Sequence, residues 1–134
     1  MKNKSKLKKI KEKKNIQTKY PSQWLFLSKQ PISVREIKAI LDTDETVSLE
    51  IWDAAGVLEI TLTDGKTIDM EMADVDLHDE YSNEFLAQFQ TKALFYVNVH
   101  PDSIALARPV MVKIAAQLEG MFCGDTDDFT PVIP

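Results

Sequence analysis

The fold is decided by residues 47–72, which read VSLEIWDAAGVLEITLTDGKTIDMEM. Apolar and polar side chains alternate here in three runs, at 47–52, 57–62 and 67–72. Such alternation is typical of β-strands with one buried face, and short turn segments separate the runs. The stretch therefore predicts three consecutive antiparallel strands joined by two hairpins.

The apolar positions also predict the register of both hairpins, because directly paired residues share one face of a sheet. A three-residue loop at 63–65 pairs Ile60 with Ile68, whereas a two-residue loop would scramble the buried face. By the same test, a four-residue loop at 53–56 pairs Leu49 with Ile60.

These registers bring acidic side chains into line on the opposite face of the three strands. One row holds Glu50, Glu59 and Asp69, and the row beside it holds Trp52, Val57 and Glu71. We call the surface made by these two rows the acidic plate. Aligned carboxylates repel one another by a few tenths of a kcal/mol per adjacent pair, so folding does not require them. The plate is either a binding surface for a basic partner or a cation, or an ordinary solvated face of an acidic protein.

Further strands and helices flank the hairpins. We expect strands at 24–27, 93–99 and 121–123, and the lack of strict alternation at 93–99 indicates a central strand covered on both faces. We also expect a short helix at 83–90.

Two main helices are predicted as well. Ser33 with Glu36 three residues later has the spacing of a capping box, which predicts a helix over 34–41. A longer helix is expected from about 103 to 119, ended by Gly120. Because Pro109 lies within it, either the helix is kinked or its regular part begins near Arg108.

The order of these elements predicts the fold class. In a chain of 134 residues we expect a flexible tail at 1–20 and a single α+β domain at 21–134. The domain would hold one mostly antiparallel sheet of about five to six strands covered by two main helices. Its layout is close to ferredoxin-like, with one inserted strand.

Charge is divided unequally along the chain. Residues 1–19 hold nine Lys and one Glu, about +8, whereas the remaining 115 residues hold seven cations and 20 acids, about −13. A disordered arm is expected, with a frayed helix as the alternative. The tail offers a handle for nucleic acid or anionic lipid, or it only solubilises the chain or folds back onto the acidic body. Its nucleic-acid contacts would be Lys6, Lys8, Lys9, Lys11, Lys13 and Lys14.

Few side chains are spaced for chemistry. The connector at 73–82 is acidic and contains His78, but its spacing is not that of an EF-hand. Cys123 and His100 would form a nucleophilic pair only if their strands were neighbours, and a buried Cys is usually a small hydrophobic residue. No phosphate-binding glycine loop or zinc-protease motif is present. We therefore predict no catalytic residue, no cofactor and no metal.

The exit loop at 124–131 carries three further carboxylates. Asp125, Asp127 and Asp128 are candidates for partner binding, and the alternatives are cation binding, helix capping or an ordinary polar loop. Together with the acidic plate, these residues predict a basic protein partner.

The chain resembles small acidic α+β proteins of bacteria without assigned activity, including toxin-immunity-type proteins. The resemblance lies in the two central hairpins, in segments 94–99 and 109–120, and in the closing Gly-Asp-Thr-Asp-Asp-Phe at 124–129. It covers most of residues 23–133 and implies a binding function in the cytosol.

We therefore expect a non-enzymatic, cytoplasmic protein-binding module, monomeric or homodimeric, with no membrane partner. The lone Cys and the absence of a long apolar run agree with that compartment. One alternative is a nucleic-acid-associated protein that uses the Lys-rich tail. Another is an enzyme or small-ligand protein with a pocket between the sheet and its helices.

Overall fold

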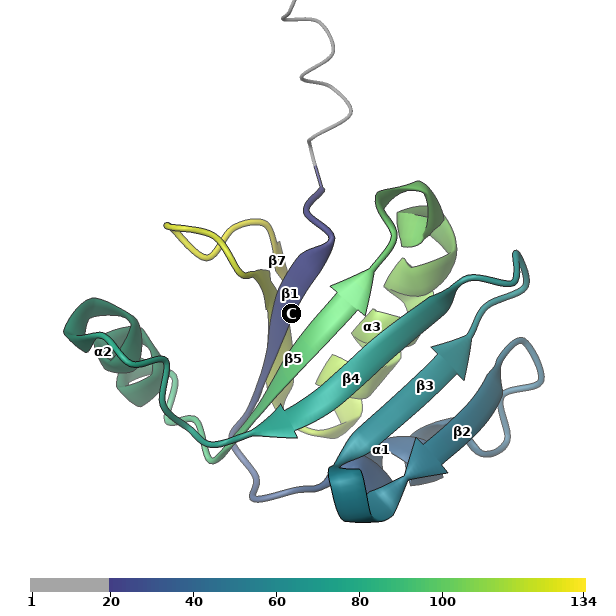
Figure 1. Ribbon diagram of the computed structural model, residues 1–134, viewed down its shortest axis with the longest axis horizontal. Coiled ribbons are helices and arrows are strands. Elements are labelled where there is room, and N and C mark those ends of the chain that lie inside the picture. The colour runs from purple at the N-terminus through teal and green to yellow at the C-terminus, as the bar shows by residue number, and fades with distance from the viewer. Residues whose placement is uncertain (1–19) are drawn as a thin grey trace, which may run out of the picture.

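The three alternating runs form strands β2 (Ser48–Trp52), β3 (Val57–Thr61) and β4 (Thr67–Ala73) in the computed structural model, which describes residues 20–134 (Figure 1). Both hairpins have the predicted register, because Leu49 pairs with Ile60 and Ile60 with Ile68. Gly65 closes the second turn with φ 84°, and its amide donates to the carbonyl of Leu62 at 3.0 Å. The positive φ explains the glycine there.

Four more strands complete one sheet. They are β1 (Gln23–Ser28), β5 (Ala93–Val99), β6 (Gly120–Gly124) and β7 (Val132–Ile133). The order is β2-β3-β4-β5-β1-β6-β7, and every neighbouring pair is antiparallel. Within residues 20–134 the sheet thus has seven strands, more than the five to six expected. The extra one, β7, is too short to show a sequence pattern.

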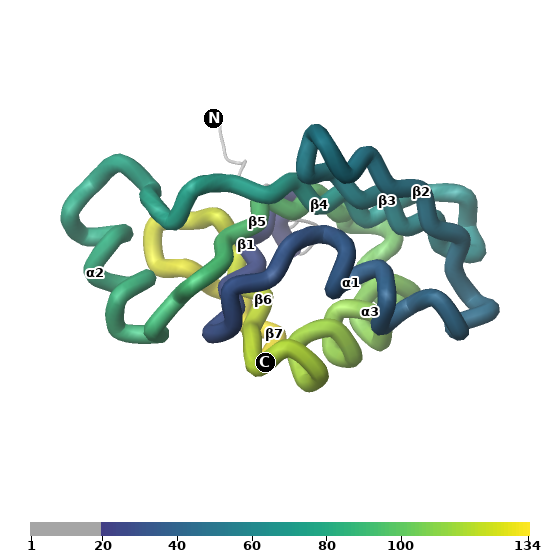
Figure 2. Tube along the Cα trace, turned by 90° about the horizontal axis from the view of Figure 1, so that it is seen from below, coloured from purple at the N-terminus to yellow at the C-terminus, as the bar shows by residue number. Residues whose placement is uncertain are grey.

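Two helices cover one face of this sheet. Helix α1 (Val34–Leu41) has the predicted bounds, and the Ser33 amide donates to the Glu36 carboxylate at 2.7 Å in the expected capping box. This contact holds the pKa of Glu36 below its usual value. Helix α3 (Ile104–Gln117) packs beside α1 under the sheet (Figure 2). The α+β class is confirmed.

A third helix lies on the opposite face. Helix α2 (Glu80–Gln88) begins three residues earlier than expected, because Asp79 caps it by accepting a hydrogen bond from the Ser82 amide at 2.7 Å. Leu86 of α2 packs with Phe129 of the exit loop over strands β1, β5 and β6. This face is therefore covered around Leu25, Leu27, Leu94 and Cys123 of β1, β5 and β6. It is open over β2, β3 and β4 and at Gln23, Tyr96 and Asn98.

The start of α3 contradicts one of the two expectations for Pro109. The helix runs from Ile104 with Pro109 inside it, after a 3₁₀ turn at Pro101–Ser103, so the regular part does not begin near Arg108. The expectation that Gly120 ends this helix is wrong. Glu119 adopts the left-handed conformation, with φ 50°, and Gly120 is the first residue of β6.

Candidate functional site

The acidic plate lies on the open half of the sheet. Glu50 pairs with Glu59, Glu59 pairs with Asp69, and the row continues through Asn98 to Gln23. The predicted alignment of three carboxylates across β2, β3 and β4 is confirmed. The row ends in two amide side chains on β5 and β1, which are 3.5 Å apart and hydrogen bonded.

The second row of the plate places an aromatic side chain at each end. Trp52 pairs with Val57, Val57 with Glu71, and Glu71 with Tyr96. Trp52 is 45 % exposed and Tyr96 is 38 % exposed, which is high for large apolar rings. Exposed aromatic side chains beside charged groups are typical of protein interfaces.

Among the described residues, no counter-charge faces the carboxylates of the plate. Within residues 20–134, Glu50, Glu59, Asp69 and Glu71 make no hydrogen bond or ion pair through their side chains, and their two rows contain no Lys or Arg. The ion pairs that Lys and Arg make in this part lie elsewhere, at Arg35–Asp53 (2.7 Å), Lys38–Asp42 (2.9 Å) and Lys113–Asp44 (4.0 Å). The charges of residues 20–134 therefore leave a negative field over the open sheet face.

The exit loop extends this surface over β1. The Asp125 amide donates to the Gln23 carbonyl at 3.0 Å and fixes the loop against the sheet. Asp125 and Asp127 line a hollow of about 430 Å³ together with Tyr81, Tyr96 and Phe129.

Asp128 has a different role from its two neighbours. It accepts hydrogen bonds from the Thr130 hydroxyl at 2.7 Å and from the Thr126 hydroxyl at 3.2 Å. These bonds hold the pKa of Asp128 below its usual value. The Asp128 carboxylate thus stabilises the conformation of the exit loop. Asp125 and Asp127, in contrast, make no side-chain bond within residues 20–134.

Tyr96 joins the plate to the exit loop. A second hollow, of about 240 Å³, lies over the plate and is lined by Asp69, Glu71, Tyr96 and Asn98 among others, so Tyr96 borders both hollows. From the sequence, Tyr96 was expected only as part of an apolar strand. A sequence signal for its exposure was present, because Tyr96 and Asn98 alternate with the buried residues of β5.

Comparison with known proteins gives this site no precedent: no protein family model, curated protein or solved structure matches the chain. The function therefore has to be argued from the geometry.

The Cys–His pair considered in the sequence is not formed. Strand β1 lies between β5 and β6, so His100 and Cys123 are not on neighbouring strands. Cys123 is buried in the cluster beneath α2, and burial, with a smaller contribution from the Asp125 charge, raises the pKa of its thiol to about 12. His100 instead accepts a hydrogen bond from the Asp102 amide through Nδ1 at 3.1 Å.

The acidic connector is organised by its own hydrogen bonds. Asp76 accepts from the His78 amide at 2.8 Å and from the Asn83 side chain at 2.9 Å, and these contacts hold the pKa of Asp76 low. The His78 side chain is 81 % exposed. Residues 20–134 contain no group of three or more His, Cys, Asp or Glu side chains placed to hold a metal ion.

Two further expectations concern the tail and the membrane. The predicted nucleic-acid contacts, Lys6, Lys8, Lys9, Lys11, Lys13 and Lys14, lie outside the described residues. Among the described residues, no helix is both long and apolar enough to cross a membrane.

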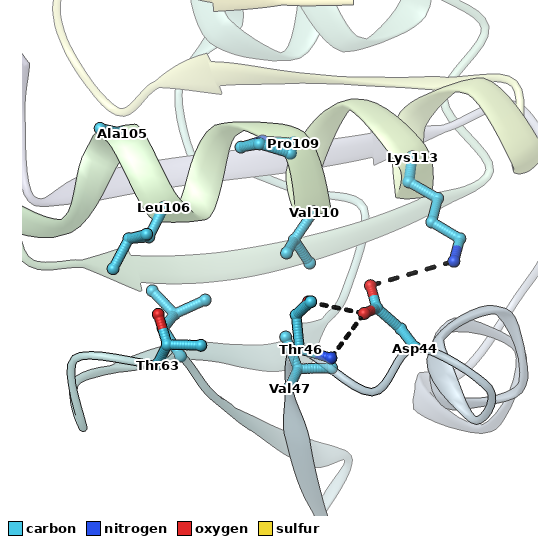
Figure 3. A pocket seen from close by; sticks show the side chains of 10 residues that line it. Asp44, Thr46, Val47, Thr63, Ala105, Leu106, Pro109, Val110 and Lys113 are labelled. Carbon is cyan, nitrogen blue, oxygen red and sulfur yellow. Dashed lines mark hydrogen bonds and ion pairs between the residues drawn. The ribbon is translucent and has the colours of Figure 1, made fainter.

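An apolar cleft of about 420 Å³ lies between α3 and the loops around β2 and β3 (Figure 3). Leu106, Pro109 and Val110 form one wall, and Asp44 and Lys113 face each other at one end. Asp44 also accepts from the Thr46 amide and hydroxyl, which keeps its pKa low. Because the two opposite charges lie 4.0 Å apart, they largely cancel, and the cleft does not select a charged ligand.

Proposed function

We propose that this protein is a non-enzymatic binding module that recognises a basic protein through the acidic plate and the exit loop. The observation that carries the proposal is the row of Glu50, Glu59 and Asp69 on an open sheet face, with no counter-charge within residues 20–134. A negative surface attracts a positive partner, speeds its association and rejects acidic competitors.

The repulsion among the aligned carboxylates of the plate supports the same proposal. Aligned carboxylates lower the stability of the free protein, and a basic partner would remove that repulsion. Trp52 and Tyr96 flank the charges and offer the apolar contact area that charges alone lack. Binding energy in protein interfaces usually concentrates on such aromatic side chains.

A more specific form of the proposal is a cytoplasmic, immunity-type protein that neutralises a basic protein toxin. It is supported by the sequence resemblance and by the net charge of −5. We also propose a ferredoxin-like layout for strands β4, β5, β1 and β6 with helices α1 and α3. Two strands, the hairpin β2–β3, would then be inserted before β4, instead of the one inserted strand expected. The strand order supports this arrangement.

The test is capture of a partner from nuclease-treated lysate of the source cell. The full-length chain is compared with the triple variant Glu50→Lys, Glu59→Lys and Asp69→Lys. We expect the wild type to capture a basic protein and the variant to lose it, because the variant reverses the charge of the plate.

A matched control separates the plate from net charge. The variant Glu45→Lys, Asp74→Lys and Glu84→Lys makes the same change of charge at exposed side chains off the plate. It should retain the partner, and circular dichroism should show that both variants are folded. Capture that survives reversal of the plate, or that is lost equally in the control, contradicts the proposal.

A second candidate function rests on the nine Lys residues within 1–19. We propose as the alternative that this segment binds the phosphate backbone of nucleic acid. The chain with Lys6, Lys8, Lys9, Lys11, Lys13 and Lys14 changed to Gln should then lose binding to duplex DNA or RNA. Wild-type affinity should fall steeply with salt, and salt-independent binding contradicts this alternative.

A further inference from the structure

The hollow beside the exit loop has aromatic walls. Tyr81 of α2 is 65 % exposed and is stacked with Phe129, their ring centroids 6.1 Å apart. Phe129 is buried and is itself stacked on Phe85 at 4.1 Å, which fixes its position. Tyr96 of β5 also lines this hollow, so its aromatic side chains come from a helix, a loop and a strand.

The same hollow is also lined by carboxylates. Asp125 and Asp127 line it from the exit loop and make no side-chain hydrogen bond or ion pair within residues 20–134. Asp79 lines it from the start of α2, and its bond to the Ser82 amide keeps the pKa of Asp79 low, so it stays ionised.

This combination selects one kind of ligand. An anion would be repelled, and an uncharged apolar group would desolvate the carboxylates without replacing their hydrogen bonds. A guanidinium group satisfies both features, because its planar face stacks on aromatic rings and its N–H groups bond carboxylates in pairs. A lysine ammonium lacks the planar face and the fork of donors.

We infer that the hollow between Tyr81, Tyr96 and Phe129 holds one arginine side chain of the basic partner, bonded to Asp125 and Asp127. The inference rests on the proposed function and names the anchor residue that this function uses. Because Tyr96 also borders the plate, residues next to the arginine in the partner would lie over Glu71 and Asp69.

The first test uses a small probe and the full-length chain. Isotope-labelled protein is titrated at low salt with N-acetyl-arginine amide, and with the lysine and citrulline amides as comparisons. We expect arginine to shift the resonances of Tyr81, Tyr96 and Thr126 in a saturable way, with lysine at least about threefold weaker. Neutral citrulline should cause no such shift. Equal shifts with citrulline, equal affinity for lysine, or shifts spread over the whole acidic surface overturn the inference.

Variants then locate the site. Asp127→Asn should weaken arginine binding by about fivefold or more, since it removes the charge from one hydrogen-bond acceptor. Tyr81→Leu should weaken it through loss of the stacking surface. Asp102→Asn is the matched control, because its carboxylate is exposed at the start of the segment before α3, away from the hollow. Unchanged affinity in Asp127→Asn and Tyr81→Leu overturns the inference.

The two proposals fail in different ways. A partner that needs the plate but binds the Asp127→Asn/Tyr81→Leu double variant normally disproves the arginine anchor and leaves the proposed function intact. A partner captured equally by the wild type and by the triple plate variant disproves the proposed function itself.

Discussion

Cys123 shows how burial determines the chemistry of a single residue. Its thiol lies on β6 opposite Leu25, under Leu86 and Phe129. Removal from water disfavours the thiolate, and the pKa rises to about 12. Since the thiolate is the reactive form, the buried Cys123 thiol is unreactive. The residue acts as a small apolar side chain in the core.

This assignment predicts slow alkylation of Cys123. At pH 8 we expect iodoacetamide to modify the folded chain at least about a hundredfold more slowly than the chain unfolded in urea. The unfolded thiol loses its proton near pH 9.0, whereas the folded thiol keeps it up to about 12. The contribution of this group to the free energy of unfolding is therefore intact below pH 9 and falls as the pH rises between these values. Mass spectrometry measures the rates, and equal rates contradict the assignment.

At the level of elements, the bounds of α1 and the register of the two hairpins could be predicted, because neighbouring residues in the sequence determine them. The capping box gave α1 its bounds, and alternation with turn spacing gave both hairpins their register. The junction of α3 with β6 was not predictable in this way. A glycine that follows a helix usually adopts the left-handed conformation that ends the helix. Gly120 is needed for a different reason, because strand β1 packs directly against it. A Cβ atom there would lie 2.6 Å from the Leu27 carbonyl oxygen and from the Phe26 ring.

Gly120→Ala should consequently destabilise the protein strongly. The added methyl group meets the backbone of β1 and a buried ring, so we expect the free energy of unfolding to fall by about 3 kcal/mol in urea denaturation. Gly65→Ala is the control, because its φ of 84° is strained for alanine but nothing lies within 4 Å of the added atom. That change should cost only about 1 kcal/mol. Equal losses at the two positions would show that conformational freedom, not close packing, explains Gly120.

At the scale of the whole molecule, the acidic plate could be predicted from the sequence, whereas the hollow beside the exit loop could not. The plate follows from pairing between strands that are adjacent in the chain, so its rows were visible in the sequence. The hollow brings together Tyr81, Tyr96 and Asp127 from three elements whose contact is created by the full sheet order. No local pattern encodes that contact, although the alternation of Tyr96 and Asn98 with buried residues of β5 indicates that Tyr96 faces solvent.

The open face also predicts a conflict between stability and binding. Glu59 lies between Glu50 and Asp69 in the same row, so it experiences repulsion from both sides. We expect Glu59→Gln to raise the free energy of unfolding by about 0.5 kcal/mol at low salt, and by less at high salt, where the charges are screened. Urea denaturation at two salt concentrations measures both effects.

Glu84→Gln provides the comparison for this effect, because Glu84 is exposed on α2 and makes no side-chain bond within the described residues. On α2 its like-charged neighbour is Glu80, one turn earlier, so its unfolding free energy should rise by no more than about 0.3 kcal/mol. A clearly larger gain in Glu59→Gln would show that the chain retains a row of charges that its fold does not need, which is expected of a surface selected for binding. If Glu59→Gln is instead neutral or destabilising at low salt, the row is an ordinary solvated face, and the main argument for the acidic plate is lost.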